Sequence, residues 1–193
     1  MATKKELAQR AFSTTEAWAD WLRDHHASSP GLWIKFAKKG SKARSITYAQ
    51  ALDVALAWGW IDGQKRGLDE SWWLQKFCAR GPRSIWSEIN RNKALKMIEA
   101  GTMKPPGLAA IESAKKSGRW DSAYASQSTA TVPPDLEAAL ARNARAAKFF
   151  ATLNSVNRYA ILFRLSTAKK AETRAARIAK FVAMLAAGEK LHP

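Results

Sequence analysis

Four of the nine tryptophans lie within residues 56–73, LAWGWIDGQKRGLDESWW, and this density of indoles is the strongest constraint on the fold. Large aromatic side chains dominate the apolar area that a small domain buries. Trp58 and Trp60 flank Gly59, a residue that adopts the left-handed conformation after a helix at little cost. We therefore predict that Trp58 closes a helix and Trp60 opens the next element. The indoles are interpreted as core in preference to an exposed ligand platform.

The flanking sequence predicts a helix followed by a hairpin. Thr47-Tyr-Ala-Gln50 is a capping box, which marks a helix that runs to Gly59. Residues 60–66 and 70–80 are then predicted as two antiparallel strands, joined by a turn that contains Gly67.

The N-terminal part predicts one further helix and one further strand. Ser13-Thr-Thr-Glu16 is a second capping box, with Phe12 placed as its apolar staple. In residues 32–38, Leu32, Ile34 and Phe36 alternate with other side chains, which is the period of a strand.

The remainder of the chain is predicted to be helical. Helices are expected between Ser84 and Gly101 and between Pro105 and Gly118, and a linker over 120–132. Three further helices are expected between Pro134 and Gly188. The predicted fold class is α+β, with a small antiparallel sheet packed with helices and then a C-terminal three-helix module. The predicted domains are residues 1–128 and residues 129–193.

The chain carries a formal net charge of +16, from 32 Lys and Arg against 16 Asp and Glu. This excess favours acidic partners such as nucleic acid, anionic lipid or an acidic protein surface. Two stretches contain no acid, between Asp24 and Asp53 and between Glu137 and Glu172. The start of the chain lacks a signal-peptide pattern and no apolar run reaches bilayer length, so we expect a cytoplasmic protein without a transmembrane segment.

Several classes of site lack their sequence signatures. His25 and His26 are adjacent, so on a helix they diverge, and the single Cys78 has no His near it in sequence. The chain contains no G-x-S-x-G, G-x-x-x-x-G-K-[ST] or G-x-G-x-x-G. We therefore expect no metal site, no catalytic set and no cofactor.

Two groups of polar residues remain as candidate sites. Asp62 lies beside Gly63, where an acid commonly stabilises a turn, and it has no second titratable group at an obvious spacing. A predicted helix start near Arg83 could hold an anion or could simply be capped. The candidate ligand-binding residues are Trp60, Asp62, Arg80, Arg83, Ser87 and Asn90. The candidate partner-binding residues, at the start of the last helix, are Lys169, Lys170, Arg174 and Arg177.

A family resemblance rests on a combination of segments. They are GWIDG at 59–63, Ser84-Ile-Trp-Ser-Glu-Ile-Asn90, Gly101-Thr-Met103 and Ala168-Lys-Lys-Ala-Glu-Thr-Arg174. Together they resemble the YdeI/OmpD-associated (bacteriocin-protection) family over nearly the whole chain. The resemblance implies the fold and, through the family's names, links to bacteriocin protection and to porins. It implies no reaction.

Three functions compete on these grounds. The first is a non-enzymatic bacterial interaction protein whose helical module contacts an acidic protein surface or another polyanion. The second is a nucleic-acid-binding protein that uses its basic surface, although no nucleic-acid-reading motif is present. The third is an enzyme or anion-binding protein with a pocket around Asp62, Arg80 and Arg83.

Overall fold

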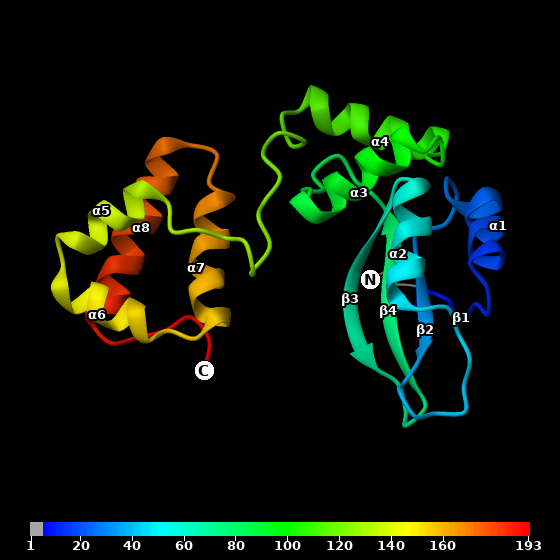
Figure 1. Ribbon diagram of the computed structural model, residues 1–193, viewed down its shortest axis with the longest axis horizontal. Coiled ribbons are helices and arrows are strands. Elements are labelled where there is room, and N and C mark those ends of the chain that lie inside the picture. Colours follow the sequence, from blue (N-terminus) through cyan, green and yellow to red (C-terminus); the bar gives the residue numbers. More distant parts are fainter. Residues whose placement is uncertain (1–5) are drawn as a thin grey trace, which may run out of the picture. The chain divides into compact units, whose positions relative to one another are not determined.

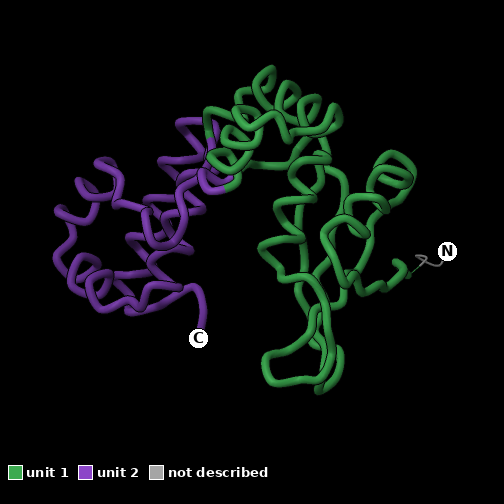
Figure 2. Tube along the Cα trace, turned by 45° about the vertical axis from the view of Figure 1, so that its right-hand side comes forward, with its two compact units in different colours: residues 1–86, 90–122 green, residues 87–89, 123–193 purple. Residues whose placement is uncertain are grey.

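The computed structural model describes residues 6–193 and divides into two compact units (Figure 2). The first comprises Met1–Trp86 and Asn90–Ser122, and the second comprises Ser87–Ile89 and Ala123–Pro193. The first unit holds the sheet, whereas the second is built from helices (Figure 1). The α+β class is therefore confirmed. Within residues 6–193, no helix is both long enough and apolar enough to cross a membrane.

The sheet contains four strands among the described residues, in the order β1-β2-β4-β3. The predicted hairpin is present as β3 (Trp60–Gly67) and β4 (Trp72–Ala79), and β4 also pairs antiparallel with β2 (Leu32–Ala37). The short strand β1 (Gln9–Ala11) pairs parallel with β2, which makes the sheet mixed. Its three residues are all exposed, so no hydrophobic alternation marked it in the sequence.

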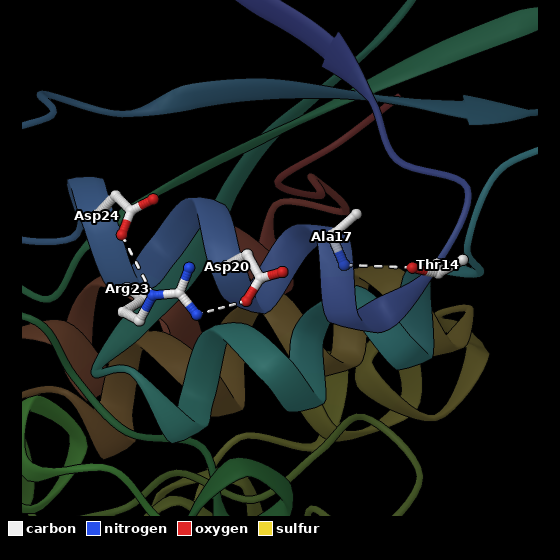
Figure 3. A network of polar contacts seen from close by, with 5 residues as sticks. All are labelled: Thr14, Ala17, Asp20, Arg23 and Asp24. Carbon is white, nitrogen blue, oxygen red and sulfur yellow. Dashed lines mark hydrogen bonds and ion pairs between the residues drawn. The ribbon is translucent and has the colours of Figure 1, made fainter.

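Helix α1 (Thr15–His25) begins one residue later than its predicted capping box requires. Thr14, not Ser13, is the N-cap, and its hydroxyl accepts a hydrogen bond from the Ala17 amide at 3.2 Å (Figure 3). The predicted box was therefore wrong by one position. Figure 3 also shows an exposed ion-pair network on this helix, formed by Asp20, Arg23 and Asp24.

Helix α2 (Tyr48–Ala57) confirms the other capping box. The Thr47 hydroxyl accepts from the Gln50 amide at 3.3 Å, and the Gln50 side chain accepts from the Thr47 amide at 2.8 Å. The helix ends before Gly59, whose φ of 72° is the predicted left-handed conformation.

An aromatic cluster joins α1 to the sheet. Trp18 is fully buried, its ring lies 6.1 Å from that of Trp60 and 5.9 Å from that of Phe77, and its indole donates to the Ala51 carbonyl of α2. The Trp60 indole in turn donates to the His26 carbonyl at 3.1 Å. Trp60, the one tryptophan of the GWIDG segment, is therefore part of the core.

Helices α3 (Glu88–Glu99) and α4 (Pro105–Lys116) follow the sheet. Helix α4 packs against the end of α2 at a distance that only glycine allows. A Cβ on Gly59 would lie 2.6 Å from the Pro106 carbonyl oxygen, and one on Gly107 would lie 2.3 Å from the Ala57 carbonyl oxygen. The Lys104 amide donates to that same Ala57 carbonyl at 3.0 Å. This contact between α2 and α4 places Gly59 and Pro106 side by side in the wall of a cavity.

The second unit contains α5 (Pro134–Ala141), α6 (Ala144–Thr152), α7 (Ser155–Ser166) and α8 (Ala171–Ala186). The sequence predicted three helices here, but the first is divided in two because Asn143 caps α6 by accepting from the Ala146 amide at 3.0 Å. The helices share one apolar core. Its buried residues are Leu136, Leu140, Ala146, Phe150, Ile161, Leu162, Leu165, Ile178, Phe181 and Leu185.

We predict that Gly59→Ala destabilises the protein more than Gly101→Ala does. Both glycines have a positive φ, but no atom lies within 4 Å of a Cβ on Gly101. Each substitution should cost about 1–2 kcal/mol for the left-handed backbone. Gly59→Ala should cost roughly 1–3 kcal/mol more, because its new methyl group meets backbone. Urea denaturation checks this, and equal losses would contradict the close contact.

Candidate functional site

A cavity of about 330 Å³ lies in the first unit, between the end of the sheet and α4. Its walls come from the end of α1, the α2–β3 junction, the end of β4, the following loop and α4. The polar and aromatic lining residues are His26, Trp58, Trp60, Arg80, Ser84, Trp86, Ser113 and Arg119. The remaining lining residues are small or proline: Gly59, Ala79, Gly81, Pro82, Pro106, Ala109, Ala110 and Ala114.

Arg80 is held against this cavity by an aromatic pair. Its guanidinium carbon lies 3.6 Å from the centre of the Trp86 ring, and its Nη1 donates to the Ile85 carbonyl at 3.2 Å. Trp86 is buried and contacts Trp120 edge to face, with ring centres 4.8 Å apart. Trp120 thus belongs to the core of the first unit, although the sequence predicted it as the start of a linker. The stacking and the hydrogen bond together hold the Arg80 guanidinium at the cavity wall.

Trp60 and Arg80 are the two predicted ligand-binding residues that line the cavity. Asp62 does not line it: this carboxylate accepts a hydrogen bond from the Tyr48 hydroxyl at 2.9 Å. Arg83 is exposed in the loop after β4 and is also absent from the cavity wall. Of the three residues of the predicted pocket, Arg80 therefore lines this cavity, whereas Asp62 and Arg83 do not.

Ser87 and Asn90 lie at the start of α3 and do not line this cavity either. Ser87 directly precedes the helix and forms a parallel bridge with Tyr124 in the second unit. Ser84, which lines the cavity, accepts from the Gly81 amide at 3.0 Å and so stabilises the loop instead of capping α3.

Sequence reasoning did not predict His26, Trp58, Ser113 or Arg119 as site residues. The sequence places Trp58 at the end of a helix and favours a core role for its indole, whereas Trp58 lines the cavity with its ring 5.2 Å from that of His26. Ser113 and Arg119 reach the cavity only because α4 packs on α2 through Gly59 and Gly107, a long-range contact without a local signature. Among residues 6–193, no group of three or more His, Cys, Asp or Glu side chains is arranged to hold a metal ion.

Two of the predicted partner-binding residues have roles within the second unit. Arg174 binds Asp135 through two hydrogen bonds of 2.5 and 2.9 Å and also donates to the Leu165 carbonyl at 2.8 Å. Arg177 donates to the Arg164 carbonyl at the end of α7. Both arginines therefore connect the start of α8 to neighbouring helices. A partner role for the exposed residues Lys169 and Lys170 stays a prediction.

The second unit also has an apolar groove of about 500 Å³ along α8. Its lining residues are Ala139, Arg142, Asn143, Ala175, Ile178, Ala179, Val182 and Ala183. Arg142 is exposed, and its side chain forms no hydrogen bond or ion pair with another residue of the described part. The groove therefore combines an apolar floor with a cation at its edge.

Two family models match the chain. Residues 10–110 match the model described as Domain of unknown function (DUF8412). Residues 129–188 match the model described as Bacteriocin-protection, YdeI or OmpD-Associated, which confirms that resemblance for the C-terminal part. The GWIDG segment lies outside the second match, so that resemblance does not extend over nearly the whole chain as predicted. No curated protein and no solved structure matched.

We predict that Asp135→Asn destabilises the second unit at neutral pH and makes its stability less dependent on pH. The hydrogen bonds from Arg174 lower the pKa of Asp135 in the folded state. Its contribution is therefore full above the carboxyl pKa of the unfolded chain, near 4, and is lost as the pH falls through the lower, folded pKa. Because both side chains are partly exposed, we expect a loss of about 0.5–1 kcal/mol at pH 7.

Urea denaturation between roughly pH 2 and pH 7 measures this difference. Glu137→Gln removes a carboxylate from the same turn of α5 that pairs with no described residue, and it serves as the matched control. An identical pH dependence of stability in wild type and Asp135→Asn would contradict the role assigned to this ion pair.

Proposed function

We propose that this chain, which belongs to the family described as Domain of unknown function (DUF8412), is an interaction protein whose C-terminal unit binds an acidic amphipathic helix. The match of residues 129–188 supports a role in binding another protein. The description of that family model names bacteriocin protection and association with OmpD. The observation that carries the proposal is the apolar groove along α8, which Arg142 lines and no Asp or Glu lines.

The shape of the groove suits a helix. Ala175, Ala179 and Ala183 follow one another at four-residue spacing along α8, so their side chains share one face. All three are exposed, and small side chains allow the backbone of another helix to approach closely. Ile178 and Val182 supply an apolar floor at the adjacent positions. An amphipathic helix that lays its apolar face into such a groove is a recurring recognition mode.

The charges around the groove favour an acidic partner. Helix α6 contains no acid, and neither does α8 after Glu172. Of the two acids on α5, Asp135 is already bound by Arg174. The other acid, Glu137, and Glu172 of α8 do not line the groove, and neither Arg142 nor Lys180 forms an ion pair with a described residue. A second copy of this chain would bring the same positive charges, and like charges at an interface cost several kcal/mol.

Nucleic-acid binding receives less support from the geometry. Binding to single strands commonly uses aromatic side chains on which bases stack. Each of the nine tryptophans is buried or half-buried within the described residues. Two of them are covered by cations: Lys65 lies 4.4 Å from the Trp73 ring and Arg66 lies 4.3 Å from the Trp33 ring. The binding experiment therefore includes single-stranded DNA as a competing ligand.

The test uses a labelled model peptide of about 18 residues, long enough to form a helix, with leucines on one face and glutamates elsewhere. Fluorescence anisotropy should show that it binds the full chain and that a version with lysine for glutamate does not. Arg142→Glu should weaken peptide binding about fivefold or more, because it replaces a positive charge at the groove with a negative charge that repels the glutamates of the peptide. Ala179→Phe should weaken it by filling the groove.

Arg44→Glu is the matched control, because it makes the same change in net charge at an exposed loop position of the first unit. A double change of Lys169 and Lys170 to Glu tests the surface predicted from the sequence. If Arg44→Glu weakens peptide binding as much as Arg142→Glu does, the proposal that the peptide binds in the groove is contradicted. Tighter binding to random single-stranded DNA than to the peptide would favour the nucleic-acid alternative instead.

A further inference from the structure

We propose that the cavity of the first unit is a binding site for a small organic acid with an aromatic or similarly flat body. This inference is independent of the partner-binding function proposed for the second unit. It rests on the sign of the charge in the cavity, on hydrogen-bond donors that have no partner in the described part of the chain, and on the shape and chemistry of the walls.

The cavity carries positive charge that no lining carboxylate balances. Arg80 and Arg119 both line it, whereas no Asp or Glu does. A guanidinium is always protonated at physiological pH, and its planar array of N–H groups matches a carboxylate. The low-dielectric walls of a partly enclosed site strengthen such an interaction relative to water. The cavity therefore selects an anion over a neutral or cationic ligand.

Several hydrogen-bond donors that line the cavity have no partner among residues 6–193. The Arg119 side chain forms no hydrogen bond or ion pair with another residue in the range 6–193. The Trp58 indole N–H and the Ser113 hydroxyl likewise have no partner among those residues. Trp60 differs, because its indole N–H is already bound to the His26 carbonyl. Arg119, Trp58 and Ser113 are therefore the groups available to a bound ligand.

The walls restrict the rest of the ligand. The tilted pair of His26 and Trp58 lies on one side, and Trp86, which carries the stacked Arg80, also lines the cavity. Alanine and proline side chains complete the surface. Aromatic rings interact favourably with one another in stacked and edge-to-face arrangements. A flat hydrophobic body would therefore be better bound than a strongly hydrated ion.

The volume limits the size of the ligand. Ligand pockets commonly measure roughly 300–1,000 Å³. At about 330 Å³, this cavity is at the lower end of that range. It suits a molecule with one or two rings and one acidic group. It is less suited to a nucleotide, which adds a sugar and a phosphate chain to a base of that size.

Isothermal titration calorimetry with three probes tests the two features of the ligand separately. Benzoate combines a ring with a charge, benzamide keeps the ring without the charge, and acetate keeps the charge without the ring. We expect benzoate to bind, and benzamide and acetate each to bind at least about tenfold more weakly. Benzamide loses the charge-assisted hydrogen bond, and acetate loses the contact of a ring with the aromatic walls. Inorganic phosphate should bind more weakly than benzoate for the same reason as acetate.

Arg119→Met keeps an unbranched side chain and removes the charge, so it should weaken benzoate binding at least about tenfold. Arg83→Met is the matched control, since Arg83 is an exposed arginine outside the cavity. Ser113→Leu should weaken binding by filling part of the cavity. Circular dichroism and urea denaturation establish that each variant is folded.

Three results would overturn the inference. The first is no benzoate binding at concentrations up to about 10 mM, which corresponds to a free energy too small for a functional site. The second is equal binding of benzamide and benzoate, because the charge would then not be recognised. The third is equal loss of benzoate binding in Arg119→Met and Arg83→Met. None of these results bears on peptide binding by the second unit, so the two proposals fail independently.

Discussion

The contact between α2 and α4 is the constraint on which the first unit depends. Gly59 and Gly107 allow the two backbones to approach to distances that a Cβ at either position would prevent. This contact places the C-terminal half of α4 beside the end of β4. The cavity lies along the same contact, between the α2–β3 junction and α4, so its existence follows from two glycines more than from any of its polar residues.

The tryptophans of the first unit contribute both to the core and to the cavity wall. Trp18 and Trp60 are buried in the core, where each indole N–H donates to a backbone carbonyl, and Trp60 also lines the cavity. Trp58 and Trp86 face the cavity, one beside His26 and the other beneath Arg80. The segment 56–73 thus contributes to both the core and the cavity wall, whereas none of its three acids, Asp62, Asp69 and Glu70, lines the cavity.

Local signals predicted much of the fold. The capping box at Thr47, the left-handed Gly59 and the alternation in β2 each act over a few residues, and each is found where the sequence places it. The site depends on contacts between distant segments, and single-sequence patterns carry little information on those. Nothing near Arg119 in sequence indicates that it lines the same cavity as Trp58, and nothing near Arg174 indicates that its charge is already bound by Asp135. For that reason a basic cluster at a helix start was interpreted as a free partner surface.

The most direct measurement is anomalous diffraction at the bromine edge from crystals of the full chain soaked with 4-bromobenzoate. If the α2–α4 contact builds a cationic aromatic cavity, a bromine peak should lie inside it, with the carboxylate toward Arg119 and Pro106 still against Gly59. A cavity closed by α4, or bromine found only on the outer surface, would contradict the account.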